Sequence, residues 1–174
     1  FREYDIRGKY GEDISKEFAF QLAHAFLCLY PFMKKIVVAY DPAPNSSLLS
    51  ATIKDVFVQQ GREVIDLGLA PDPLYYFSLF YEGYDGGVMV SSSHMIEFSG
   101  FTLTVRKPGS LYPEDVIEDE LEKIKELISA DAMAQGSGVQ GSVIAFAPSA
   151  EYQKYVSPRI HLRRPLKIIF DCGN

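Results

Sequence analysis

The sequence predicts an α/β domain, built as a three-layer α/β/α sandwich around a mainly parallel, mixed sheet. Short runs rich in β-branched residues alternate along the chain with segments whose apolar residues recur at helical spacing. The run at 36–40 is continuously apolar, which is typical of a strand buried on both faces. Because parallel strands need a crossover connection, usually a helix, this alternation indicates a sheet with helices on both faces.

The first half of the chain is expected to contain three helix–strand units. Apolar residues at helical spacing predict a first helix over residues 14–30, which Pro31 ends. Gly61 is expected to end the second helix, and Pro73 to stand in the first turn of the third. The remaining expected elements are a strand at 36–40, a helix at 45–60, a strand at 64–67, a helix at 73–81 and a strand at 87–90.

The second half is expected to complete this domain and to begin another. Alternating Thr and apolar residues predict a half-exposed strand over 101–105. We expect residues 1–160 to form one domain, and residues 161–174 to be a linker and the truncated first strand of a second domain. The other expected elements are an amphipathic helix at 113–128, a loop at 131–142, a short helix at 151–156 and a buried strand at 166–170.

Composition limits the classes of partner. The 174 residues include 17 Lys and Arg against 23 Asp and Glu, a formal net charge of -6. This balance gives no reason to expect nucleic acid or a membrane surface as partner, so any phosphate site must be a local concentration of positive groups. Cys28 and Cys172 make neither a disulfide framework nor a metal site, which favours an intracellular, cytoplasmic protein. No apolar run reaches the roughly 18 residues of a membrane span.

Polar residues follow the expected strands at their carboxyl ends, where sheets of this kind bind ligands. The three segments concerned are 41–47, 68–73 and 91–100. Ser93 and His94 close a run of three serines and could supply a nucleophile and a proton partner. A polar turn is the alternative interpretation of this run, and capping of the next helix is the favoured interpretation of residues 41–47.

The N-terminal segment combines arginine, acidic and aromatic residues ahead of the first helix. Arg7 beside Gly8 offers a guanidinium group and a close backbone approach to a phosphate. The alternative is a frayed terminus with a surface salt bridge. His24 is expected to pack within the first helix, and His161 to lie on a solvated basic face.

Taken in order, these segments resemble the first domain of the phosphohexomutases, the phosphoglucomutase/phosphomannomutase family. The resemblance covers essentially the whole chain. Its blocks are Phe1-Arg2-x-Tyr4-Asp5-Ile6-Arg7-Gly8, Tyr40-Asp41-Pro42, Asp66-Leu67-Gly68-Leu69-x-Pro71-x-Pro73, Asp85-Gly86-Gly87-Val88-Met89-Val90, Ser92-Ser93-His94, Gly100-Phe101 and Asp171-Cys172-Gly173-Asn174.

The resemblance implies an intramolecular phosphotransferase that interconverts hexose 1-phosphate and hexose 6-phosphate through a phosphoserine. Ser93 would carry the phosphoryl group and bind Mg²⁺ through its phosphate, together with a loop of the second domain. His94 would support the phosphoserine loop, and Tyr4 and Arg7 would bind substrate phosphate. A hexose 1,6-bisphosphate would act as activator. The remaining domains of the full-length chain would be needed, so this chain alone is expected to be inactive.

Three positions depart from the family pattern. Thr102 stands where the family usually has a lysine that assists proton transfer, and a hydroxyl cannot replace an ammonium group. Arg7 is the expected catalytic substitute. Asp72 and Ala43 stand where Thr and Arg are common, and the segment after His94 is one residue shorter. The alternative function is therefore a non-catalytic sugar-phosphate-binding or regulatory relative.

Overall fold

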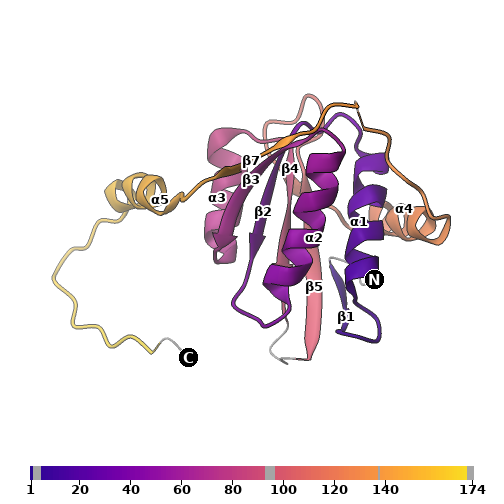
Figure 1. Ribbon diagram of the computed structural model, residues 1–174. Helices are drawn as coiled ribbons and strands as arrows, with labels where there is room; N and C mark the ends of the chain where they lie inside the picture. The colour runs from indigo at the N-terminus through magenta and orange to yellow at the C-terminus, as the bar shows by residue number, and fades with distance from the viewer. Residues whose placement is uncertain (2–4, 93–96, 137, 172–174) are drawn as a thin grey trace.

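A mixed sheet of seven strands forms the centre of the described molecule. The computed structural model describes residue 1 and residues 5–92, 97–136 and 138–171 (Figure 1). The strand order is β1-β5-β4-β2-β3-β7, with β6 paired to β5. The strands are β1 (Ile6–Lys9), β2 (Lys35–Tyr40), β3 (Glu63–Leu69), β4 (Gly86–Ser91), β5 (Phe98–Val105), β6 (Glu114–Asp115) and β7 (Ser142–Ala145).

The sheet has a parallel half and an antiparallel half. Strands β4, β2, β3 and β7 run parallel to one another, whereas β5 is antiparallel to β1, β4 and β6. This arrangement confirms the predicted α/β class and the mixed sheet.

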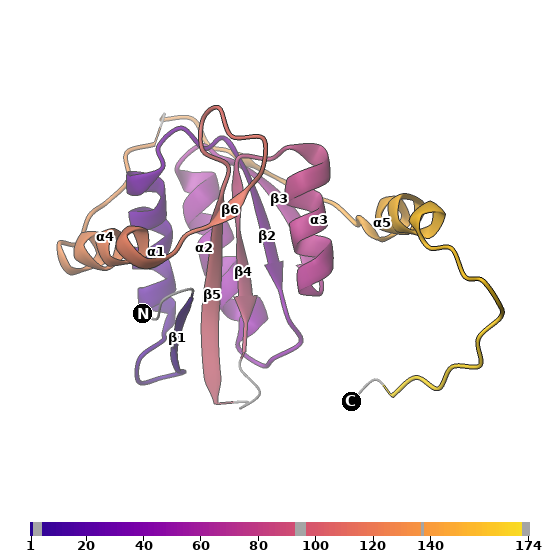
Figure 2. The ribbon, with the colours of Figure 1, turned by 180° about the vertical axis from the view of Figure 1, so that it is seen from behind.

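Helices cover both faces of the sheet. Figure 1 shows α1 and α2 on one face, and Figure 2, seen from behind, shows α3 on the other side of the strands. α4 packs against α1. None of the described helices is long and apolar enough to cross a membrane. The helices are α1 (Lys16–Leu29), α2 (Ser46–Gln59), α3 (Asp72–Glu82), α4 (Glu118–Ser129) and α5 (Ser149–Val156).

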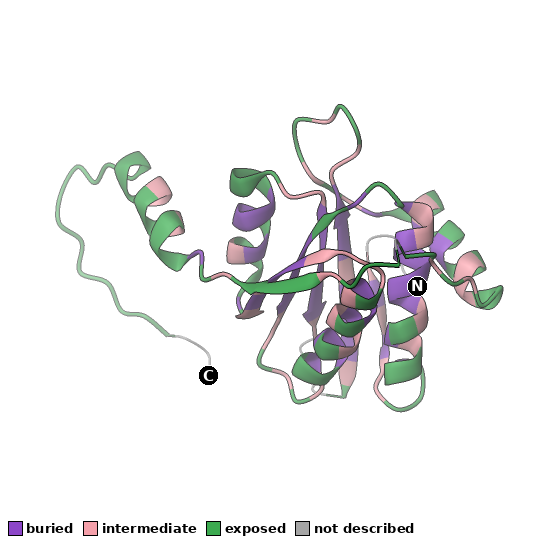
Figure 3. Cartoon of the chain, turned by 45° about the horizontal axis from the view of Figure 1, so that its top comes forward, coloured by how far each residue is buried: buried purple, intermediate pink, exposed green. Residues whose placement is uncertain are grey.

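The central strand β2 is buried on both faces, as its continuous apolar sequence predicts. In β2, Ile36 and Val38 pack in the core shared with α1 and α2, and Val37 and Ala39 in the core beneath α3. All four have no exposed surface. Figure 3 shows this burial in purple along the strands, with the C-terminal segment in green.

Local signals set several helix ends. Ser15 caps α1, because its hydroxyl accepts a hydrogen bond from the Phe18 N–H at 3.1 Å. α3 ends at Gly83, whose φ of 73° lies in the left-handed region that glycine adopts most easily.

The predicted helix at 113–128 was too long. Its first part forms β6, and the Val116 N–H donates to the Leu103 carbonyl at 2.8 Å, which continues the pairing with β5. α4 begins only at Glu118. Val116 fits the apolar pattern of a helix because it is buried, but it lies beside β5 and not in a helix.

The predicted half-exposed strand at 101–105 was wrong in its exposure at Thr104, whereas Thr102 is half-buried. Thr104 is only 1% exposed. Its hydroxyl accepts a hydrogen bond from the Tyr75 hydroxyl at 2.9 Å and lies 2.9 Å from an Asp115 carboxylate oxygen. Thr104 is therefore buried and not exposed, because its hydroxyl makes hydrogen bonds with Tyr75 and Asp115.

The predicted buried strand at 166–170 is absent, and its apolar side chains are exposed; Ile169 is 96% exposed and Phe170 82%. A strand needs a neighbour for its backbone hydrogen bonds, and none of the described strands pairs with this segment. The domain boundary near residue 160 stays a prediction. The structure also contains β1 and β7, two strands that the sequence did not predict.

Candidate functional site

The strand order reverses between β2 and β4, and a pocket lies at this point. The chain passes from β2 through α2 to β3 on one side of β2, and then from β3 through α3 to β4 on the other. In open α/β sheets, ligands bind at such points, beyond the carboxyl ends of the strands. The pocket has a volume of about 690 Å³. Its lining is Arg7, Asp41, Pro42, Leu69, Ala70, Pro71, Asp72, Pro73, Tyr76, Met89, Ser91, Ser92 and Thr102.

One side of this strand-end pocket follows from the register of β1, β5 and β4. Gly100 of β5 pairs with Arg7 of β1 on one side and with Ser91 of β4 on the other. Directly paired residues share a face, and alternate residues along a strand do so too, so Thr102 faces the same way. A Cβ atom on Gly100 would lie 2.7 Å from the Ile6 carbonyl oxygen, so glycine permits the close approach of β1.

Arg7 is therefore part of the sheet. Its guanidinium group makes an ion pair with Asp5 at 2.5 Å, and the two side chains are 31% and 23% exposed. The alternative of a frayed terminus is thus excluded for residues 6–9. Asp5 also orients the guanidinium group, because an arginine–carboxylate pair is directional.

Asp41, directly after β2, joins the ends of two other elements. One carboxylate oxygen accepts hydrogen bonds from the Ser92 N–H at 2.6 Å and the Ser92 hydroxyl at 3.1 Å. The other accepts from the Ser46 hydroxyl at 2.5 Å and the Ala43 N–H at 3.0 Å. Asp41 thereby ties the carboxyl end of β4 to the start of α2. Asn45 occupies the N-cap position of α2, but its side chain makes no cap hydrogen bond.

Tyr76 is a pocket residue that the sequence analysis did not single out. Its hydroxyl donates to both carboxylate oxygens of Asp115, at 3.1 and 3.0 Å. Burial and the Asp115 charge raise the pKa of Tyr76, so the phenol stays neutral and remains a donor. A helical pattern over 73–81 predicts the helix but not which of its aromatic residues faces the pocket.

The charges of the lining do not make a strongly positive site. Asp41 and Asp72 are both present, and burial, followed by the charge of Asp41, raises the pKa of Asp72. Arg7 is the cation in the described lining, and it is paired with Asp5.

The two cations that follow β5, Arg106 and Lys107, bind groups outside the pocket. Arg106 donates hydrogen bonds to the carbonyls of Tyr84, Leu79 and Leu111, at 3.2, 2.6 and 2.6 Å. Lys107 makes an ion pair with Glu120 at 3.0 Å. Neither lines the pocket.

The other predicted site residues have different outcomes. Tyr4, Ser93 and His94 lie outside the described residues, and Ser92 directly precedes Ser93. His24 is packed as predicted, being 2% exposed.

No metal site is complete in the part of the chain that the structure describes, because no three His, Cys, Asp or Glu residues there are grouped to hold an ion. Both carboxylate oxygens of Asp41 already accept hydrogen bonds. The described residues alone therefore do not fit Mg²⁺.

Similarity to known proteins extends over the whole chain. The family model described as phosphoglucomutase/phosphomannomutase, alpha/beta/alpha domain I, matches residues 1–130. A phosphoglucomutase of Neisseria meningitidis serogroup B is 28% identical over 100% of this chain and 37% of its own length. A phosphomannomutase of Escherichia coli is 29% identical over 100% of this chain and 38% of its own length. The chain thus spans little more than a third of these relatives.

Solved structures agree with the sequence relatives. A phosphoglucomutase/phosphomannomutase family protein from Burkholderia thailandensis superposes with a TM-score of 0.77 at 25% identity, covering 95% of this chain and 36% of that one. A putative phosphomannomutase from Thermus thermophilus shares the fold, with a TM-score of 0.72 at 19% identity over 92% of this chain and 36% of its own. The chain therefore belongs to the phosphoglucomutase/phosphomannomutase family, whose first domain its residues 1–130 match.

Proposed function

We propose that this chain is the phosphoserine domain of an isomerase that interconverts hexose 1-phosphate and hexose 6-phosphate by intramolecular phosphoryl transfer. The observation that carries the proposal is the strand-end pocket, in which Arg7, Ser91, Ser92 and Thr102 meet on adjoining strands. Ser93, the proposed carrier of the phosphoryl group, follows Ser92 directly. The names of the relatives support the reaction class.

In the first transfer, the bond between phosphorus and the Ser93 oxygen breaks, and a bond forms between phosphorus and a sugar hydroxyl oxygen, which loses its proton. The second transfer is the reverse: the bond between the other phosphorus of the bisphosphate and its sugar oxygen breaks, that oxygen takes up a proton, and the phosphoryl group returns to the Ser93 oxygen. Catalysis of such a step depends mostly on positioning and on stabilising the charge of the phosphoryl oxygens. Arg7 can donate to those oxygens from β1. Asp41 holds the backbone of Ser92, the residue from which Ser93 extends.

Mg²⁺ belongs to the proposal only as an ion held by the Ser93 phosphate and by groups outside the described residues. When bound, it would supply positive charge to the phosphoryl oxygens. Tyr4 and His94 are proposed, by the resemblance, to contact substrate phosphate and to support the phosphoserine segment.

The presence of Thr102 in the pocket favours the alternative function, that of a non-catalytic sugar-phosphate-binding relative. It lines the strand-end pocket, so the usual lysine is missing at the pocket itself. The mutase is the favoured function, because Arg7 lines the same pocket and the relatives are named as mutases.

The test uses the full-length protein and a hexose 1,6-bisphosphate. After incubation, peptide mapping should place one phosphate on residues 91–93, and Ser93→Ala should remove both the phosphate and the mutase activity. Ser91→Ala is the matched control and should still be phosphorylated. Phosphate found elsewhere, or mutase activity without phosphate in this segment, would refute the assignment. Binding of a hexose phosphate without turnover would establish the non-catalytic function instead.

A further inference from the structure

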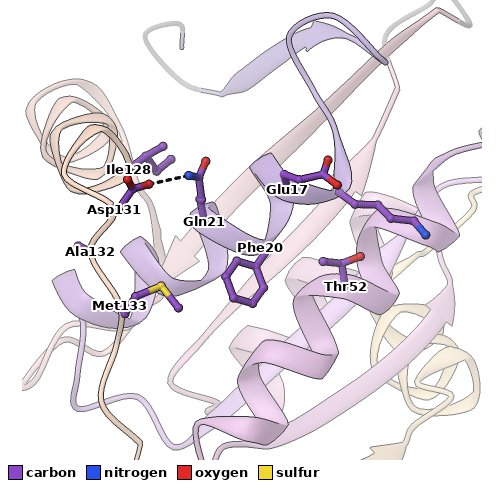
Figure 4. Close-up of a pocket in the computed structure, with 9 residues that line it drawn as sticks. Glu17, Phe20, Gln21, Thr52, Ile128, Asp131, Ala132 and Met133 are labelled. Carbon is purple, nitrogen blue, oxygen red and sulfur yellow. Dashed lines mark hydrogen bonds between the residues drawn. The ribbon is translucent and has the colours of Figure 1, made fainter.

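A second pocket lies between α1, α2 and the segment that follows α4 (Figure 4). Its volume is about 420 Å³, within the roughly 300–1,000 Å³ typical of small-molecule sites. It shares no lining residue with the strand-end pocket. We call it the helix pocket, and its lining is Lys16, Glu17, Phe20, Gln21, Thr52, Ile128, Asp131, Ala132 and Met133.

The outer wall of the helix pocket is held in place by hydrogen bonds to α1. The Gln21 amide donates to the Asp131 carboxylate at 2.9 Å, and the Ala134 N–H donates to Nδ1 of His24 at 3.2 Å. The backbone of Asp131 has a φ of 49°, an uncommon conformation for a residue other than glycine. Asp131 takes this conformation because it follows the C-cap of α4: its N–H donates to the Ile128 carbonyl at 3.0 Å, and the Ala132 N–H donates to the Leu127 carbonyl at 2.9 Å.

The interior of the helix pocket is mainly apolar and open to a ligand. Phe20 is 36% exposed and Met133 54% exposed, although both are large apolar residues. Figure 4 shows these two side chains extending into the space between the helices and the wall. An aromatic ring and a polarizable thioether together suit a flat or flexible apolar group.

The polar groups around this apolar interior carry an excess of negative charge. The lining contains two carboxylates, those of Glu17 and Asp131, and one ammonium group, that of Lys16. Hydrogen bonds from its own backbone N–H and from Ser15 lower the pKa of Glu17, so it is ionised at neutral pH. A cation above the face of Phe20 would also be attracted by the ring.

We propose that the helix pocket binds a small amphipathic cation, that is, an aromatic or branched aliphatic group carrying one ammonium group. The apolar part packs against Phe20 and Met133, and the ammonium group lies towards Glu17 and Asp131. This inference is independent of the phosphoryl-transfer site.

The probe is 2-phenylethylammonium, compared with neutral 2-phenylethanol and anionic 3-phenylpropanoate. Binding is followed by NMR of the protein with ¹³C-methyl-labelled methionine, and Met133→Leu assigns the Met133 signal. Met33 and Met89 are internal controls, because they are 0% and 2% exposed and lie outside the pocket. We expect the Met133 signal to shift saturably with a Kd on the order of 1 mM. The alcohol and the carboxylate should bind at least about fivefold more weakly.

Matched variants locate the site. Phe20→Ala should weaken binding at least about tenfold, whereas Phe32→Ala should not, although Phe32 is also 36% exposed. Asp131→Asn keeps an acceptor for Gln21 and tolerates the positive φ, so its expected loss of about threefold reports the charge. Asp119→Asn, outside the pocket, is the control for charge.

Three results would overturn the proposal. They are an unmoved Met133 signal, equal binding of the alcohol or the carboxylate, and equal losses in Phe20→Ala and Phe32→Ala. Circular dichroism of each variant verifies that it is folded. If Phe20→Ala is unfolded, Phe20→Leu replaces it and should also weaken binding, because it removes the aromatic ring while Met133 remains as the reporter.

Discussion

Replacement of Asp41 by alanine tests how strongly one carboxylate holds the strand ends together. The side chain accepts four hydrogen bonds, from Ser92 N–H, Ser92 hydroxyl, Ser46 hydroxyl and Ala43 N–H, at 2.6, 3.1, 2.5 and 3.0 Å. Hydrogen bonds to a charged group contribute about 1.5–3 kcal/mol each when buried. The two hydroxyls can turn to water after the substitution, and the site is partly exposed, so the two N–H groups set the cost. We expect Asp41→Ala to lower the free energy of unfolding by about 2–4 kcal/mol.

Asp41→Asn should lower the free energy of unfolding by a smaller amount, about 1–2 kcal/mol. The amide oxygen can still accept hydrogen bonds from one pair of donors, whereas the NH₂ group faces the other pair of donors. Urea denaturation followed by circular dichroism measures both values, with an unchanged m-value as the condition for comparing them. Asp55→Ala is the control. Asp55 is an exposed residue of α2, so its replacement should stay within about 0.5 kcal/mol. A loss below about 0.5 kcal/mol for Asp41→Ala would show that these four contacts do not stabilise the strand ends.

Two further predictions concern His24 and Thr102. Burial lowers the pKa of His24, and only the neutral ring can accept from the Ala134 N–H, so the unfolded state takes up the proton first. The free energy of unfolding should therefore fall as the pH drops below about 6.5, by up to about 1.4 kcal/mol per pH unit. Urea denaturation should show a shallower pH dependence of this free energy for His24→Gln than for the wild type, and no change for His161→Gln, because His161 is exposed. Equal pH dependence in the two variants would contradict the prediction. In the full-length enzyme, Thr102→Lys should raise kcat at least about tenfold, because it adds a cation beside Arg7. Thr102→Val is the control and should not raise kcat. A lower kcat in Thr102→Lys would refute the role given to Arg7.

The sequence predicted best the elements that are buried on both faces. Apolar residues make up most of β2, β3 and β4, and Ser15 and Gly83 mark a helix start and a helix end, so local pattern and tertiary structure agree there. The edge strands were harder, because β6 and β7 have two and four residues and are defined by their pairing with a neighbour. Asp115 illustrates the difficulty. Its carboxylate contacts Tyr76, which is 39 residues earlier in the chain.

The location of the candidate site was also predictable, because the carboxyl ends of parallel strands meet at one edge of the sheet. The partners within the site were not. Asp41 reads as part of a helix-capping turn, yet two of its four hydrogen bonds come from Ser92, 51 residues away. The importance of Gly100 likewise appears only when β1 is seen to lie against it. Such contacts depend on register between distant strands, which a single sequence does not reveal.

The charge of the strand-end pocket bears on what this chain can do alone. Its described lining contains two carboxylates, those of Asp41 and Asp72, and one guanidinium group, that of Arg7, which contacts Asp5. A phosphate group brings further negative charge, and like charges within a few ångströms repel by about 4 kcal/mol near a protein surface. Thr102 adds no charge to offset this. The proposed transfer therefore needs positive groups that these residues do not supply, from Mg²⁺ or from the rest of a longer chain. For this reason we expect the 174-residue chain alone to be inactive, with turnover no higher than that of its Ser93→Ala variant.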